Sequence, residues 1–151
     1  MIHVQDRLVR LQPVRLALPL SLAFLTLFTS GCKSIQAAQE DSKNLIVELH
    51  KEINAADYNG IYANADPAFR EGTSAADSEL IFKGVHDKLG QANSSELQNT
   101  RWVVNTNGEF ITSDFKSSFT RDAADEEVVW RKTDGGYHLY RYNINSKAFF
   151  R

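Results

Sequence analysis

The chain has 151 residues, 24% of them charged and 11% aromatic, and a formal net charge of −2. This length suits one domain with a packed core, and the mildly acidic balance lacks the basic stripe that phosphate binding needs, so we expect no nucleic-acid partner. Because the chain has a single cysteine, we expect no internal disulfide and no cysteine-based metal site.

The N-terminal segment has the composition of a targeting sequence. Its positively charged part contains three arginines, Arg7, Arg10 and Arg15. An uncharged, mostly aliphatic block follows at residues 16–28, which is shorter than the roughly 20 apolar residues of a bilayer span and contains Pro19. Its length favours the apolar region of a signal peptide. The small residues 29–31 then lead to Cys32.

This order of features resembles the precursors of bacterial lipoproteins. The resemblance implies that the Cys32 thiol is diacylglycerated, that the chain is cleaved before it, and that the new amine is acylated, with palmitate as an expected fatty acid. Ser30 and Gly31 match the small residues of that family, whereas Thr29 departs from the more usual leucine. Lys33 stands where an aspartate would favour the inner membrane, so the resemblance implies the outer membrane, facing the periplasm. The alternative is an ordinary secretory signal or an uncleaved anchor with a free thiol.

Cleavage before Cys32 would remove three arginines and one aspartate, leaving 120 residues with a net charge of −4. Two or three acyl chains give a stable membrane anchor, at about 0.8 kcal/mol per buried methylene. We therefore expect a signal peptide at residues 1–31, a lipidated tether at 32–40 and a single domain at 41–151. So short a tether would hold the domain close to the membrane surface.

Helical spacing of apolar residues marks the first half of this domain. A helix is expected to start at Asp41 or Ser42, either of which can cap it, and to end at about Asn54. Its apolar face consists of Leu45, Ile46, Leu49 and Ile53. A short helical segment is expected around residues 57–62.

Two further helices are expected before the strands begin. Asp66 can cap a short helix at residues 67–72, which has a proline at its first position and a glycine at its end. Thr73 or Ser74 opens a longer helix that ends at Leu89 before a terminating glycine. Its apolar stripe consists of Ile81, Phe82, Val85 and Leu89.

From about Leu97 onward, β-branched and aromatic residues predict strands. The four segments that we expect to be strands are residues 100–106, 109–120, 126–132 and 137–144, joined in part by hairpin turns at Asn107-Gly108 and at residues 134–136. In the second strand, three residues share one face because alternate side chains point to the same side: Ile111, Phe115 and Phe119. The same alternation places Tyr142 and Ile144 on the side opposite to Leu139. The fold class is therefore α+β, with N-terminal helices packed on a bent antiparallel sheet of three to four or more strands.

The order of these segments resembles small bacterial envelope domains of the nuclear-transport-factor-2-like superfamily. The resemblance covers residues 42–144 and rests on "ADYNGIYANADPAFR", on a helix ending in "KLG" and on the closing "RKTDGGYHLYRYNI". It implies a cystatin-like cone in which a bent antiparallel sheet wraps around helices. Many members of that superfamily are non-catalytic.

Motifs for chemistry are absent from the sequence. The histidines of the domain, His50, His86 and His138, have no second histidine or cysteine at ligand spacing, so we interpret them as partly exposed surface residues and expect no metal. The acidic residues 121–127 lack the spacing of a calcium loop and are interpreted as a solvated hairpin turn. There is no nucleophile elbow and no phosphate-binding glycine loop, so we expect no cofactor.

Proton-transfer enzymes with this fold place an acid or histidine in an apolar cone. The nearest candidate here is Asp114, with a tyrosine as hydrogen-bond donor, but strand alternation points Asp114 away from Phe115 and toward the wetter face. We therefore expect no catalytic residues and no enzyme.

The aromatic residues of the strands have three interpretations. The first is ordinary core and cross-strand packing. The second is a ligand pocket between helices and sheet, lined by Tyr62, Trp102, Trp130 and Tyr140, with Arg141 at its mouth. The third is that the outward sheet face binds a protein partner or forms a homodimer. The sequence thus predicts a lipid-anchored envelope protein that acts as a non-catalytic binding or accessory module, or alternatively a small-molecule pocket or degenerate enzyme that uses the cone interior.

Overall fold

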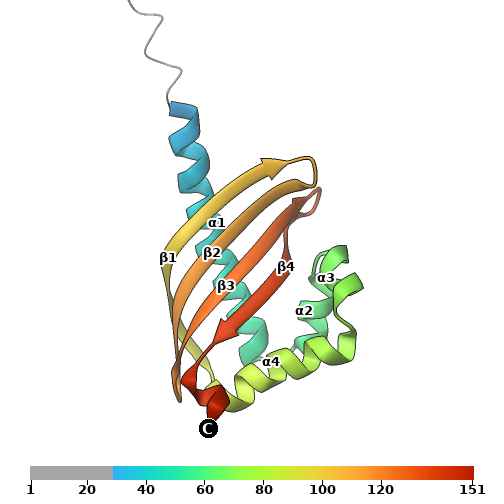
Figure 1. Ribbon diagram of the computed structural model, residues 1–151, viewed down its shortest axis with the longest axis vertical. Coiled ribbons are helices and arrows are strands. Elements are labelled where there is room, and N and C mark those ends of the chain that lie inside the picture. The colour runs from blue at the N-terminus through green and yellow to red at the C-terminus, as the bar shows by residue number, and fades with distance from the viewer. Residues whose placement is uncertain (1–28) are drawn as a thin grey trace, which may run out of the picture.

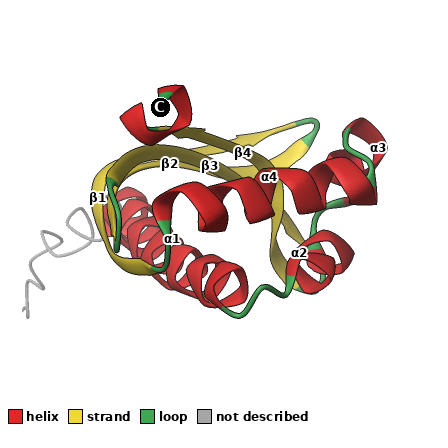
Figure 2. Cartoon of the chain, turned by 90° about the horizontal axis from the view of Figure 1, so that it is seen from below, coloured by secondary structure: helices red, strands yellow, loops and turns green. Residues whose placement is uncertain are grey.

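The helices of this protein lie on one face of a curved, four-stranded antiparallel sheet (Figure 1). The computed structural model describes residues 29–151, so the arginines and the apolar block of the predicted signal peptide lie outside the described residues. Seen from below, the strands arch over α1 and α4 (Figure 2). Within the described residues, none of the helices combines the length and apolarity that a membrane crossing requires.

Helix α1 (Thr29–Asn54) begins earlier than the sequence predicts. Its end at Asn54 is as expected, but the residues interpreted as a tether, 32–40, are helical. Ala37, Ala38, Gln39 and Glu40 are good helix formers, and Ala38 is only 2% exposed, so propensity and packing act together to extend the helix.

The apolar face of α1 packs into the core as predicted. Ile46, Leu49 and Ile53 are buried, and Leu45 packs at the edge of the same cluster. Higher on the helix, the Ser42 hydroxyl lies 2.6 Å from the hydroxyl of Ser113, and both side chains are buried. The helix is therefore in contact with the sheet from Ser42 to Asn54, which is its predicted length.

The next three helices are α2 (Tyr58–Asn64), α3 (Pro67–Gly72) and α4 (Ala75–Leu89). Each begins at a cap whose side chain accepts a backbone N–H of the first turn: Asp57, Asp66 and Ser74. The caps Asp66 and Ser74 were predicted, and Asp57 was not. In α4 one prediction is wrong, because Ile81 is 43% exposed and Ser78 occupies the buried face with Phe82. The other three residues of the predicted stripe, Phe82, Val85 and Leu89, are buried as expected.

Asp66 joins the short helices to the sheet. Its carboxylate, which is completely buried, lies 2.7 Å from Nε of Arg131, and its backbone N–H donates to the carbonyl of Leu139 at 2.9 Å. A cap residue thus also covers part of the free edge of the last strand, which limits its pairing with other chains.

The strands follow in the order β1 (Ala92–Asn105), β2 (Gly108–Phe119), β3 (Ala123–Thr133) and β4 (Gly136–Asn145), and a short 3-10 helix, η1 (Lys147–Phe150), ends the chain. The two predicted hairpins are confirmed, with turns at residues 106–107 and 134–135; the first turn thus lies one residue before the predicted Asn107-Gly108 pair. Strand β1 begins earlier than expected because Asn54 holds its first residue: the side-chain amide donates to the Ala92 carbonyl at 3.0 Å and accepts from its N–H at 2.8 Å.

A β-bulge in β4 overturns one prediction about the faces of the sheet. Val129 pairs with Arg141 but Trp130 pairs with Leu139, which leaves Tyr140 as the extra residue. The extra residue reverses the alternation, so Leu139 and Tyr142 lie on the same, helix-covered face. The Tyr142 ring accordingly packs 5.2 Å from that of Phe82.

The interior between helices and sheet is filled by large side chains. Those that are essentially inaccessible include Phe82, Phe115, Ile46, Ile53, Leu89 and Ile111. Phe115 meets Trp130 edge to face, with ring centroids 6.2 Å apart. The α+β class predicted from the sequence is therefore confirmed, with a packed interior.

Candidate functional site

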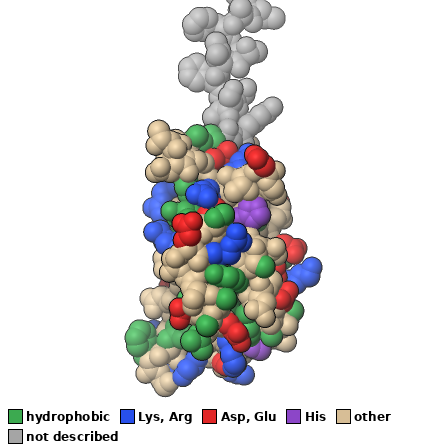
Figure 3. Space-filling view, turned by 90° about the vertical axis from the view of Figure 1, so that its right-hand side faces the viewer, with side chains coloured by type: hydrophobic (Ala, Val, Ile, Leu, Met, Phe, Trp, Pro, Cys, Tyr) green, Lys and Arg blue, Asp and Glu red, His purple; other side chains and the backbone are tan. Residues whose placement is uncertain are grey.

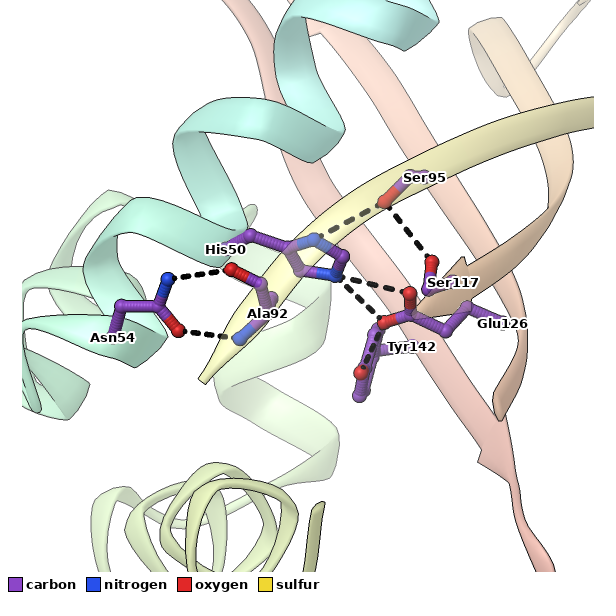
Figure 4. Close-up of polar contacts among 7 residues, drawn as sticks. All are labelled: His50, Asn54, Ala92, Ser95, Ser117, Glu126 and Tyr142. Atoms are coloured by element: carbon purple, nitrogen blue, oxygen red, sulfur yellow. Dashed lines mark hydrogen bonds and ion pairs between the residues drawn. The ribbon is translucent and has the colours of Figure 1, made fainter. Parts of the chain in front are cut away.

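A buried histidine and a buried carboxylate face each other under the sheet. His50 of α1 is 6% exposed and Glu126 of β3 is 2% exposed. The Nε2–H of His50 points at both carboxylate oxygens of Glu126, at 3.1 Å from Oε1 and 3.0 Å from Oε2 (Figure 4). A charge this deeply buried requires such a partner, because an isolated ion in the interior is strongly disfavoured.

Three hydroxyl groups complete this arrangement, which we call the His50–Glu126 network. The Tyr142 hydroxyl donates to Oε1 of Glu126 at 2.6 Å. On the other side, Nδ1 of His50 lies 3.2 Å from the Ser95 hydroxyl, which accepts a hydrogen bond from Ser117 at 3.0 Å. Figure 4 shows these side chains converging from separate elements. One residue comes from α1 and one from each strand, so the network ties the helix to the whole sheet.

Hydrogen bonding decides the charge state of the network. Burial by itself raises the pKa of Glu126, but the hydrogen bond and charge of His50, together with the Tyr142 hydroxyl, outweigh it and hold that pKa below the ordinary carboxyl value. Burial, followed by the charge of Glu126 and the hydrogen bond to it, raises the pKa of Tyr142 well above the ordinary value. Glu126 is therefore an ionised acceptor and Tyr142 a neutral donor at neutral pH.

Two sequence interpretations are wrong at this point. His50 was expected at the surface and residues 121–127 in a solvated turn, yet His50 and Glu126 are both buried. The spacing contains a signal for each. His50 lies four residues after Ile46 and three before Ile53, on the apolar stripe of α1, and Glu126 alternates with Val128 on the inner face of β3.

The structure does not bring the predicted pocket residues together. Trp130 is buried, and the Tyr62 hydroxyl donates to the Arg70 carbonyl at 3.3 Å, both on the inner side. Because of the bulge, Tyr140 and Arg141 lie on the outer face, where Tyr140 packs against Phe110 with ring centroids 5.2 Å apart.

The fifth predicted pocket residue, Trp102, belongs to a second polar cluster near the hairpin turns. Its indole Nε1 donates to Glu109 at 3.1 Å, and the Tyr137 hydroxyl donates to the same oxygen at 2.6 Å. The hydrogen bond from Tyr137 is the main cause that lowers the pKa of Glu109, and Lys132 adds an ion pair at 3.4 Å. This cluster was not predicted.

A groove of about 210 Å³ opens between α1, α2 and the last two strands. Trp130 is the only predicted pocket residue among those that line it: Leu45, Glu48, Leu49, Glu52, Ile61, Asn64, Trp130, Tyr137, His138 and Leu139. A second groove of about 370 Å³ runs between α1 and the start of β1 and touches His50 and Ser95. The described residues thus offer shallow grooves at the rim of a filled cone.

The remaining candidates have ordinary surroundings. Asp114 lies on the outer face as predicted and accepts from the Asn99 amide at 3.2 Å. His86 is partly buried on α4, and Nδ1 of His138 lies 2.7 Å from the Asn64 carbonyl. Among residues 29–151 we find no group of three histidine, cysteine, aspartate or glutamate side chains that could hold a metal ion.

Fold and network together define an α+β domain in which one helix is fixed to the inner face of an antiparallel sheet by a chain of side-chain hydrogen bonds. The family model described as Protein of unknown function (DUF4019) matches residues 48–142, and the chain belongs to this family. The matched segment includes all five side chains of the His50–Glu126 network.

Comparison with solved structures finds a similar protein from Novosphingobium aromaticivorans, described as an NTF2-like protein with a cystatin-like fold. The two chains are 13% identical, with a TM-score of 0.44, and the match covers 78% of this chain and 90% of the other. No curated protein matches the sequence.

Proposed function

We propose that this protein is a lipid-anchored protein of the cell envelope, held in the outer membrane and facing the periplasm, that acts as a non-catalytic binding or accessory module. One observation carries the non-catalytic part of the proposal: the buried acid–base pair, His50 and Glu126, is fully engaged with groups of the protein itself. A general acid or base must be able to reach a substrate proton. Both oxygens of Glu126 are instead occupied by His50 and Tyr142.

The filled interior supports the same conclusion. A cone that served as an active site or ligand cavity would need open space around a poised carboxylate. Here Phe82 and Tyr142 pack ring to ring beside the network, and the ring of His50 lies 5.4 Å from that of Phe119. The grooves that remain are at the surface.

The outer face of the sheet is the surface that we assign to a protein partner. Near the hairpin turns it presents Phe110 and Tyr140 together with Arg101 and Arg141, whereas Arg131 beside them is paired with Asp66. Aromatic residues and arginine are enriched in protein interfaces. Arg101 and Arg141 both contact the carboxylate of Glu127, and Asp114 lies directly opposite Glu127 on β2, so this face carries charges of both signs. The partner surface that fits is therefore one of mixed charge beside apolar side chains, with carboxylates facing Arg101 and Arg141.

The interface can be tested by photo-crosslinking in cells that produce the protein. A photoreactive amino acid at position 141 should give one discrete protein adduct, whereas the same residue at the exposed position 79 on α4 should give none. Adding Phe110→Ser should abolish the adduct at 141, because it removes the aromatic part of the surface. Equal adducts at both positions, or an adduct that survives Phe110→Ser, would contradict the assignment.

The anchor is tested separately with labelled palmitate. The wild-type chain should incorporate the label and float with membranes, and Cys32→Ala should do neither. Incorporation of label into Cys32→Ala would show that the fatty acid is attached elsewhere.

A second candidate function is favoured by the order of three side chains. Ser95, His50 and Glu126 follow one another as nucleophile, base and orienting acid do in hydrolases, and Ser95 borders the groove of about 370 Å³. Hydrolysis of short p-nitrophenyl esters distinguishes the two functions. A binding module predicts equal background rates for wild type and Ser95→Ala, whereas a rate that depends on Ser95 would favour a hydrolase.

A further inference from the structure

Contacts along α1 show which end of the domain its N-terminus approaches. Asn54 bonds to Ala92 at the start of β1, and His50 bonds to Ser95 a little further along. Ser42 then bonds to Ser113 of β2, whose partner on β1 is Thr100. The helix therefore runs antiparallel to β1, so that its first residues lie toward the end of β1 and the β1–β2 turn. Figure 1 shows both at the upper end, away from α4 and the C-terminus.

The spacing places Cys32 level with that turn. Ser42 is ten residues after Cys32, which corresponds to about 15 Å of helix at about 1.5 Å per residue. Thr100 is five residues before Asn105, or about 17 Å of strand at about 3.3 Å per residue. The same reckoning puts Ile35 level with Val103 along the helix axis.

This end of the domain carries exposed aliphatic side chains. Ile35 is 38% exposed, Val103 46% and Val104 60%. Because Val103 and Val104 are consecutive in a strand, they point to opposite faces and make both sides of the strand end apolar. The turn that follows, residues 105–108, has no charged side chain. We call Ile35, Val103, Val104 and this turn the hairpin end.

We propose that the hairpin end lies on the lipid bilayer surface, an inference that rests on the proposed lipid anchor at Cys32. The buried Ala38 is only six residues after Cys32, which corresponds to about 9 Å of helix. Acyl chains at Cys32 would thus be joined to the core by a helix rather than by a flexible tether. They would hold the end of the domain that carries Val103 and Val104 at the membrane surface. Exposed aliphatic residues at the opposite end, such as Leu80 at 68%, lack this connection.

Lipid-borne quenchers test this orientation on the full acylated protein. Val104→Cys and, as a matched control, Leu80→Cys are labelled with an environment-sensitive fluorophore and reconstituted into phosphatidylethanolamine–phosphatidylglycerol vesicles. Spin-labelled lipid should quench the fluorophore at position 104 at least threefold more than the one at position 80. Val103→Cys should behave like Val104→Cys, and near-ultraviolet circular dichroism verifies that each variant is folded.

The failure of the inference can be told apart from failure of the anchor. The wild-type protein, whose only cysteine is Cys32, should float with the vesicles and take no thiol label. If it floats without label, but positions 104 and 80 are quenched equally, the membrane-facing end is wrong and the anchor stands. If wild-type protein takes label at Cys32 and does not float, both proposals are overturned.

Discussion

Glu126 and Glu127 are neighbours in β3, yet the two faces of the sheet give them opposite surroundings. Glu126 points inward, is 2% exposed and is bonded to His50 and Tyr142. Glu127 points outward and pairs with Arg141 at 2.9 Å and Arg101 at 3.7 Å, with all three side chains in contact with water. The comparison teaches that charge on the inner face holds the fold together, whereas charge on the outer face is available to partners.

The side of the molecule shown in Figure 3 resembles the outer face in this respect. Acidic, basic and hydrophobic side chains are interspersed there, without a large area of one sign. Mixed charge of this kind suits protein contacts better than the binding of a polyanion.

The largest expected effect comes from removing the inner carboxylate. Glu126→Ala should lower the free energy of unfolding by about 3–5 kcal/mol, because it leaves the buried His50 without its partner. Glu127→Ala, the matched control, should cost about 1 kcal/mol or less, since exposed ion pairs contribute little. Urea denaturation measures both. Similar losses for the two variants would show that the inner and outer faces do not differ in this way.

A smaller effect is expected from the tyrosine hydroxyl on the inner face. Tyr142→Phe keeps the ring packing against Phe82 but removes a hydrogen bond to the ionised Glu126, which should cost about 1.5–3 kcal/mol. Tyr140→Phe on the outer face should change stability by less than about 0.5 kcal/mol. An unchanged midpoint for Tyr142→Phe would contradict the importance of that hydrogen bond.

Acid titration should also separate the two faces. The pKa of Glu126 is lower in the folded than in the unfolded protein, so its contribution to stability is complete above the unfolded value of about 4.3 and is lost as the pH falls through the folded value. Below about pH 4.3 the free energy of unfolding should therefore fall less steeply with pH in Glu126→Gln than in the wild type. It should fall more steeply in Glu127→Gln than in Glu126→Gln. Part of the slope should remain, because the pKa of Glu109 is lowered too. Unfolding midpoints measured between about pH 6 and 3 provide the comparison.

The smallest effect on stability is expected from the outer arginine. Arg141→Ala should change the free energy of unfolding by less than about 1 kcal/mol, because the ion pair it loses is exposed. The same substitution should weaken the binding of a partner that presents carboxylates. With a photoreactive residue at position 101, Arg141→Ala should lower the yield of the crosslinked adduct several-fold. A stable variant with an unchanged adduct yield would show that Arg141 does not take part in partner binding.

Much of the fold could be predicted because its signals are local. The caps Asp66 and Ser74 and the hairpin signal at Asn107-Gly108 act within a few residues of themselves, so their types alone indicate, to within a residue, where elements begin and end. The candidate site could be predicted only in part. The inward stripe of α1 includes His50, but nothing local to Glu126 indicates that a histidine lies above it.

By itself, then, the sequence determined the class of the fold, the ends of most helices and the pairing of hairpins. Only the tertiary structure decided three features: the extra helical turns that pack Ala38, the bulge at Tyr140 that moves Tyr142 to the inner face, and the burial of Glu126 beneath His50. The reason is physical. Caps and turns depend on near neighbours in the chain, whereas burial and register depend on partners up to 76 residues away, which come together only when the helix closes over the sheet.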